Sequence, residues 1–326
     1  MSSQNNNGAY PLGQTIRVDC SNPEQSDLEL LVTRHAEAWT SSCGMVVEMI
    51  NRLGQEDQPS SRGKPEEAFL KLFDRRHVHD LRSNNCIGLW GQHRERALIE
   101  GISNGNIGRL LYKLHTEPGY YRKTESHRDY ADDEAFLWNE CITSFHRERQ
   151  AYSILSKYQG NLVPLFLGDV TLDVRPSNFL ESLPKGLFQV RGLLLEHLEG
   201  FSLADVTNHA PQSSWQGIFN KAINLVHVLD GEGILKRGVT PEQFIVVPKE
   251  GGEYRVCMTG LGRCEIREDD ESDEEWARKK WFFAEEDRLA GALKDKVEEN
   301  GEFVLEFEPS LKYAQVWEKD EQHESK

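Results

Sequence analysis

The sequence lacks any long hydrophobic run, because no stretch of its 326 residues reaches about 18 consecutive apolar residues. A helix that spans a membrane needs about 20, so none is expected. The N-terminal stretch MSSQNNNGAYPLGQ has no apolar core and predicts no secretory signal peptide. A cytoplasmic or nuclear protein is therefore expected, with nothing in the residues to choose between the two.

Cysteine is scarce and scattered, with no C-x-x-C pair among the six residues, Cys20, Cys43, Cys86, Cys141, Cys257 and Cys264. This spacing excludes the usual zinc-binding motifs and a dense disulfide framework. Free thiols in a reducing compartment are expected.

The chain also has few basic residues relative to acidic ones. The chain has 38 Lys and Arg against 54 Asp and Glu, a formal net charge of −16. Such a charge repels the phosphate backbone of nucleic acids and anionic lipid headgroups, so neither is expected as a partner. By itself, strong acidity indicates only a soluble surface.

The first half of the chain predicts strands separated by polar segments. Residues 1–15, rich in Asn, Gln, Ser and Gly, predict a disordered N-terminus. Strands are predicted at 14–20, 43–50 and 68–74, with a polar loop at 54–67. The charged region that follows predicts an insertion over about 83–135, with one or two helical turns at 94–102 and a long loop at 114–133.

Longer helices are predicted in the second half. Apolar residues at helical spacing predict helices at 134–157 and 213–233, the latter capped by Ser213 or Ser214. An apolar strand run at 189–200, a short helix capped by Ser202, and a hairpin pairing FIVV with YRVCM are also predicted. The acidic stretch 265–275 leads to another helical region at 276–296. Mixed helices and strands indicate an α+β fold.

Two segments carry a family resemblance: LKLFDRRHVHDLR (70–82) and ERQAYSILSKYQGNLVPLFLG (148–168), followed by the order of elements in 234–262. Together they resemble the protein-kinase-like superfamily, and more specifically the kinase-like proteins of filamentous fungi. The resemblance covers roughly 25–320. It implies a two-lobed kinase-like fold, with a small β-rich lobe at 16–195 and an abbreviated helical lobe at 196–326.

The same resemblance implies a nucleotide site. Lys71 matches the strand lysine that holds phosphates, with Lys113 as a competing candidate, and Glu148 matches the helix glutamate that pairs with that lysine. Backbone groups of Glu196 and Leu198 lie where a hinge bonds adenine. The alternatives are a solvated lysine, an exposed glutamate and a connector that binds no ligand.

The chain departs from the family where chemistry takes place. In LKRGVTPEQFIVV (235–247), Gly238 stands at the position of the catalytic base and Gln243 at that of the metal-binding asparagine. In VCMTGLG (256–262), Gly260 stands at the position of the metal-binding aspartate. The segment 33–44, expected to cover the nucleotide, has only Gly44. Losing one positioned acid–base group alone costs about 10²–10⁴ in rate.

Three functions remain open. The first is a catalytically inactive kinase-like protein, a pseudokinase, that acts through a protein partner and has no bound metal. The second is an atypical phosphotransferase in which carboxylates such as Glu242 or Asp269 replace the missing ones. The third is a sensor that binds ATP without magnesium and does not catalyse. A metal site at His77, His79 and His93 is not expected, because no carboxylate or thiol accompanies them at a suitable spacing.

Overall fold

The computed structural model describes residues 9–21, 27–36, 39, 41–52, 67–123, 128–176, 183–298 and 303–307. The chain divides into two compact units. The first unit comprises Met1–His146 and Phe166–His197, and the second comprises Arg147–Leu165 and Leu198–Lys326. Both contain helices and strands, in agreement with the predicted α+β class. The predicted loop at 54–67 lies almost entirely outside the described residues.

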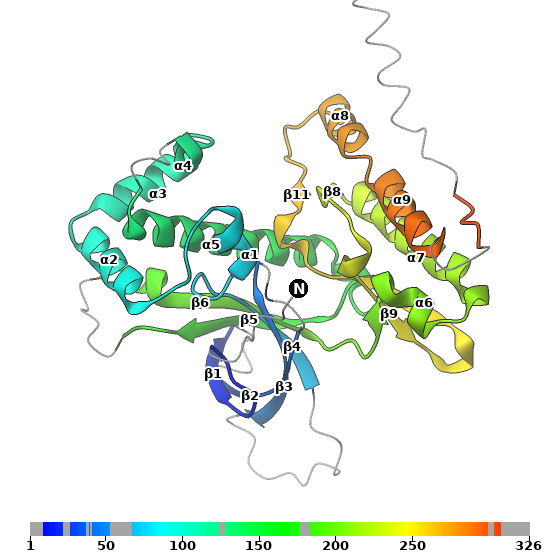
Figure 1. Cartoon of the computed structure of the whole chain (residues 1–326), viewed down its shortest axis with the longest axis horizontal. Helices are drawn as coiled ribbons and strands as arrows, with labels where there is room; N and C mark the ends of the chain where they lie inside the picture. The colour runs from blue at the N-terminus through cyan, green and yellow to red at the C-terminus, as the bar shows by residue number, and fades with distance from the viewer. Residues whose placement is uncertain are drawn as a thin grey trace, which may run out of the picture. The chain divides into compact units, whose positions relative to one another are not determined.

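A closed antiparallel barrel forms the body of the first unit (Figure 1). Its strands follow the order β1-β2-β3-β4-β6-β5. Their bounds are β1 Thr15–Cys20, β2 Asp27–His35, β3 Cys43–Arg52, β4 Glu67–Phe73, β5 Phe166–Asp173 and β6 Gln189–Glu196. The barrel closes where Asp19 and Cys20 pair with Thr171 and Val170. Strand β2 was not predicted as a separate strand, and neither was the closure.

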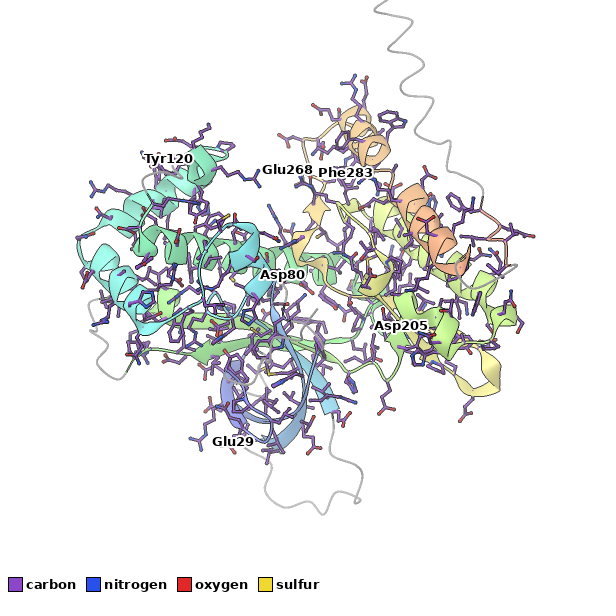
Figure 2. All side chains as sticks on the ribbon, viewed as in Figure 1. Glu29, Asp80, Tyr120, Asp205, Glu268 and Phe283 are labelled. Carbon is purple, nitrogen blue, oxygen red and sulfur yellow. The ribbon has the colours of Figure 1, made fainter. Side chains whose placement is uncertain are left out.

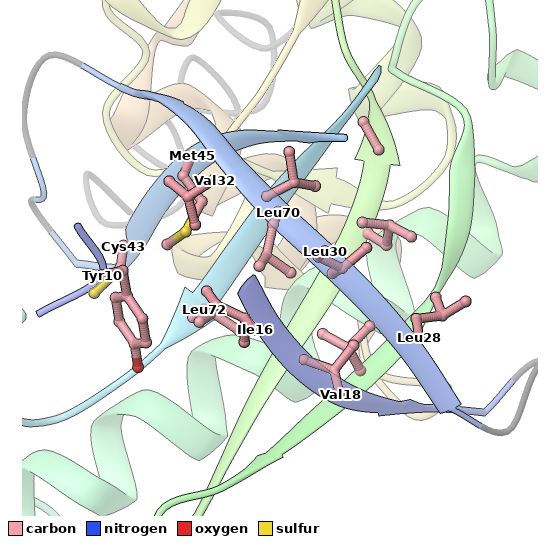
Figure 3. Packing of buried hydrophobic residues seen from close by; sticks show 14 of the residues in the cluster. Tyr10, Ile16, Val18, Leu28, Leu30, Val32, Cys43, Met45, Leu70 and Leu72 are labelled. Carbon is pink, nitrogen blue, oxygen red and sulfur yellow. The ribbon is translucent and has the colours of Figure 1, made fainter. Parts of the chain in front are cut away.

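The buried side chains of alternate residues in the strands fill the inside of this barrel. Along β1, Ile16, Val18 and Cys20 point inward while the residues between them are exposed. They pack against the inward side chains of the other strands, as Figure 3 shows for Val18, Leu30 and Leu70. Strands with this period of two bury one face each, which fixes their register.

The N-terminal stretch is ordered earlier than predicted. Tyr10 is only 4% exposed, and its hydroxyl donates to the Asp74 carboxylate at 2.7 Å. The Gly13 amide also donates to the carbonyl of Val32. The prediction of disorder is therefore wrong for residues 9–15, because Tyr10 fills a buried position; residues 1–8 lie outside the described part of the chain.

Helices interrupt the first unit between β4 and β5. They are α1 His79–Asn84, α2 Gln92–Ser103, α3 Asn106–Thr116, α4 Tyr120–Lys123 and α5 Tyr130–Ile154. The loop predicted at 114–133 is therefore wrong for 114–116, 120–123 and 130–133, which are helical. Ile107, Leu110 and Leu114 lie on one face of α3 and pack into a core with α2 and α5, which stabilises the helix. We call α2, α3 and α4 the inserted helices (Figure 1).

A buried ionic network joins β4 to these helices. The Glu134 side chain is fully buried and accepts hydrogen bonds from Arg75 and Arg82 at 2.5–2.9 Å. Arg75 also pairs with Glu95 at 2.7 Å, and an Arg94 nitrogen lies 3.7 Å from a Glu134 oxygen. Three guanidinium groups thus surround one carboxylate, which satisfies charges that would be costly to bury alone.

The second unit begins with the end of α5 and contains two small sheets. β7 (Phe201–Ser202), β9 (Phe244–Pro248) and β10 (Tyr254–Met258) form one sheet; β8 (Ile234–Leu235) and β11 (Glu265–Ile266) form the other. The β9–β10 hairpin confirms the predicted pairing. Its helices are α6 Val206–His209, α7 Gln212–Gly231, α8 Asp273–Phe283 and α9 Glu285–Glu298.

Two predicted helix caps had different outcomes. The Ser202 hydroxyl accepts from the Ala204 amide, as predicted. The predicted cap of α7 by Ser213 or Ser214 is wrong, because the helix starts earlier, after Pro211, with no side-chain cap. Pro211 has an extended conformation that leads directly into the helix.

All six cysteines are described, and all are free thiols, as predicted. Within the described residues, no helix combines the length and the apolar composition that crossing a bilayer requires.

Candidate functional site

Lys71 lies near the middle of β4, between the backbones of Gly44 in β3 and Leu193 in β6. The residue is 9% exposed, and its ammonium lies 5.4 Å from the centre of the Phe73 ring. Most of this lysine is therefore buried. The competing Lys113 lies on helix α3 and is exposed, so it is not a strand lysine.

The segment 33–44 does not form a glycine-rich cradle in its described part. Thr33–His35 belong to β2, and the Trp39 indole is buried and donates to the Gly44 carbonyl at 3.0 Å. A Cβ at Gly44 would lie 2.7 Å from the Phe69 ring. Gly44 is thus required for packing against Phe69, a structural role distinct from phosphate binding.

Glu148 and Lys71 belong to different units, so their pairing stays a prediction. Glu148 is completely buried, in the part of α5 that belongs to the second unit. Burial raises the pKa of the Cys264 thiol to about 11, while Lys236 lowers that pKa and Glu148 raises it. Glu148 and Lys236 therefore act on the same thiol within the second unit.

The predicted hinge lies where the chain passes from one unit to the other. Glu196 ends β6 in the first unit, paired with Ala68, and Leu198 is the first residue of the second unit in this stretch. Both are half-buried. Adenine binding by their backbone groups stays a prediction.

The side chain of Gln243 closes the loop that contains Gly238. The Gln243 amide oxygen accepts from the Thr240 amide at 3.4 Å, and its nitrogen donates to the Gly238 carbonyl at 3.3 Å. Gly238 has a φ of 131°, in a region that favours glycine. An aspartate at this position would be strained, by about 1–3 kcal/mol. The backbone of this loop thus disfavours the aspartate that the family has there.

A buried lysine, Lys236, contacts the turn that contains Gly260. Lys236 is 4% exposed, and its ammonium donates to the carbonyl oxygen of Gly260. Gly260 itself has a φ of 70°, and the next residues, Leu261–Arg263, form a 3₁₀ turn. A cation supplied by the chain thus contacts the turn in which Gly260 was predicted to replace a metal-binding aspartate.

Glu285, the first residue of α9, binds the backbone of the segment that contains Lys236 and Arg237. Its carboxylate accepts from the backbone amides of Lys236, at 3.2 Å, and of Arg237. Lys280 approaches Glu285 at 3.4 Å and Asp230 at 3.6 Å. The Arg237 guanidinium lies 5.4 Å from the ring of Phe283, which is labelled in Figure 2. The backbone of Lys236 and Arg237 is therefore fixed by a buried carboxylate.

Of the three histidines considered as metal ligands, His77 has the most distinctive surroundings. Its ring lies 6.0–6.4 Å from the rings of Tyr10, Trp39 and Trp90. His93 instead packs against Tyr130, with ring centres 5.1 Å apart. His77 is thus one ring of an aromatic cluster in the first unit.

We expect His77 to make the first unit sensitive to acid. Burial lowers its pKa from 6.5 to about 4, and Arg76, His79 and Arg82 lower it too, against the opposing effect of Asp74. The unfolded chain then binds a proton below pH 6.5 that the folded chain refuses until about pH 4. Stability should fall by about 3 kcal/mol over that interval.

Urea unfolding between pH 4 and pH 7 measures this slope, and His77→Gln should flatten it. Asp74 provides an internal check, because Arg76 holds its pKa below the usual range. Its contribution is lost only as the pH falls below about 4. An unchanged slope in His77→Gln would assign the acid sensitivity to other groups.

Comparisons with known proteins add little. No family model matches this chain. No curated protein matches its sequence either. Among solved structures, it is similar to a double mutant of the PknI kinase domain of Mycobacterium tuberculosis, at 10% identity and a TM-score of 0.38. The similarity covers 91% of this chain and 83% of that one.

Sequence reasoning missed the groups that close the candidate loop. It assigned no role to Lys236 and did not consider Glu285, which lies 49 residues further along. A lysine directly before Arg237, in a segment with few other charges, was a usable signal. The contact from α9 had no comparable signal, since nothing in the spacing links the two segments.

Proposed function

We propose that this chain is a catalytically inactive member of the protein-kinase-like superfamily, with a small β-rich lobe, an abbreviated helical lobe and a function exerted through protein contacts. The order of elements and the matched segments support the fold. The observation that most directly supports the proposed inactivity is the hydrogen bond from the buried Lys236 ammonium to the Gly260 carbonyl. With this cation already on the turn, a divalent metal would meet repulsion, and Gly260 itself offers no carboxylate.

Physical chemistry supports this proposal at three positions. Magnesium requires near-octahedral oxygen ligands at about 2.0–2.1 Å, usually including carboxylates. Gly238 and Gly260 have no side chain, and the Gln243 amide is bonded within its own loop. Glu242 and Asp269, the alternative carboxylates, are exposed residues. The net charge of −16 supports a protein partner over nucleic acid or a membrane.

We predict no magnesium-dependent phosphoryl transfer from ATP. Purified protein incubated with γ-labelled ATP and magnesium should release no phosphate and label no protein above the buffer control. Lys71→Ala is the matched variant. Turnover that this variant abolishes would overturn the proposal and support the atypical phosphotransferase instead.

Thermal unfolding measured with ATP, ADP and magnesium, each added separately, distinguishes a nucleotide sensor from a protein that binds no nucleotide. A ligand that binds only the folded state adds about 2.7 kcal/mol of stability at a hundredfold excess over its Kd. A shift with ATP that needs no magnesium and is lost in Lys71→Ala would support nucleotide sensing. No shift at millimolar nucleotide would leave protein contacts as the function.

A further inference from the structure

Residues of α3, α4 and the start of α5 line a pocket that the proposed function does not use. Its volume is about 330 Å³, at the lower end of the range for small-molecule sites. It lies in the first unit, where Figure 2 labels Tyr120. Its lining combines basic and aromatic side chains: Asn106, Arg109, Leu110, Lys113, Tyr120, Tyr121, Arg128 and Asp132.

Positive charge is concentrated at this pocket, although the whole chain is strongly acidic. Three basic residues line it, Arg109, Lys113 and Arg128, against one acidic residue, Asp132. The segment 106–132, which contains all the lining residues, has five Lys and Arg residues and four Asp and Glu residues, in a chain of net charge −16. The lining groups therefore sum to two positive charges, which matches a dianion.

The Arg128 side of the pocket is held in place by stacking. Its guanidinium lies 4.1 Å from the centre of the Tyr121 ring, and Tyr121 stacks on Phe136 with ring centres 3.6 Å apart. The Tyr121 hydroxyl donates to Asp133 at 2.8 Å, and Asp133 also accepts from Arg94 at 3.1 Å. A guanidinium stacked on a ring keeps its donors in its own plane, where paired anion oxygens bind.

The α3 part of the lining has two like charges one helical turn apart. Arg109 and Lys113 are both exposed on α3, and like charges at this spacing destabilise a helix. Lys113 lies 4.7 Å from the centre of the Tyr120 ring, and Arg109 donates to the Asn106 side chain. An anion between these cations would relieve their repulsion.

We propose that this pocket binds a small organic phosphate monoester. Arg109, Lys113 and Arg128 hold the phosphate, whose charge at neutral pH is close to −2. Asp132 accepts a hydrogen bond from a hydroxyl or amino group of the same ligand, and Leu110 contacts its carbon skeleton. This inference does not depend on the kinase-like proposal, because the lining includes only Lys113 of the residues considered there, and Lys113 is not a strand lysine.

Calorimetric titration of the full chain with glucose 6-phosphate, ribose 5-phosphate and phosphoserine tests this proposal. At least one of these esters should bind, whereas glucose, which lacks the phosphate, should not. The double variant R109E/K113E should weaken binding at least tenfold. Both residues are exposed, so the fold should persist, which circular dichroism would verify.

R122E/K123E is the matched control, because both residues are exposed on α4 and the charge change is identical, yet neither lines the pocket. It should bind with nearly unchanged affinity. An equal loss in both double variants would assign binding to general surface charge and overturn the proposal. The absence of binding by all three esters would overturn it too, as would inorganic phosphate binding as tightly as the best ester.

Discussion

Glu134→Ala should destabilise the first unit by about 3–5 kcal/mol, the largest loss we expect from any single substitution considered. The carboxylate is fully buried and accepts from Arg75 and Arg82 at 2.5–2.9 Å. Removing it leaves buried guanidinium groups without their shared counter-charge, which typically costs this amount. Urea unfolding followed by circular dichroism measures the change.

Glu274→Ala is the matched control. Glu274 pairs with Arg278 at 3.0 Å, one turn away on α8, and both side chains are about half exposed or more. Exposed pairs at this spacing contribute about 0.3–0.5 kcal/mol. A loss below about 1 kcal/mol in Glu134→Ala would mean that Glu95 and Asp133 compensate the arginines and that the network is not centred on Glu134.

The barrel strands were predictable where hydrophobic residues alternate, as in β1 and, less regularly, in β4. The closure was not, because it depends on two residue pairs, Asp19–Thr171 and Cys20–Val170, about 150 positions apart in the sequence. Contacts between residues so far apart in the chain leave no pattern in the local sequence. Tyr10 was missed for the same reason, since its buried partner Asp74 is 64 residues away.

The inserted helices show a different kind of error. The spacing of Ile107, Leu110 and Leu114 indicates an amphipathic helix, and this signal was present in the sequence. Pro118 and Gly119, together with the charged residues that follow, favoured a loop instead. Tertiary packing decided between the two, because these apolar residues share a core with α2 and α5.

The identity of the candidate site stays a prediction, and its geometry could not be predicted from the sequence. Gly238, Gln243 and Gly260 are identified by counting along a motif, and that count needs no structure. Their surroundings do: the Gln243 amide closes its own loop, and Lys236 donates to the Gly260 carbonyl. The motif predicts which groups are replaced, whereas the structure describes how the residues at those positions are bonded.

Glu285→Ala should be the second most damaging substitution, with an expected loss of about 2–4 kcal/mol. This buried carboxylate accepts from the backbone amides of Lys236 and Arg237 and lies 3.4 Å from Lys280. Its loss leaves two backbone donors unsatisfied, at about 1–3 kcal/mol each. Lys280 retains Asp230 at 3.6 Å, so the loss should be smaller than for Glu134→Ala.

Glu286→Ala, at the next residue of the same helix, is the matched control for Glu285→Ala. Its carboxylate contacts His227 at 3.1 Å, and the His227 side chain is about half exposed, so the loss should stay below about 1 kcal/mol. The two variants should also differ in loop mobility, measured by hydrogen exchange at Lys236 and Arg237. Neither should gain magnesium-dependent ATP turnover, because releasing the backbone supplies no carboxylate at Gly238 or Gly260. Turnover in Glu285→Ala alone would instead identify Glu285 as the group that keeps a competent loop inactive.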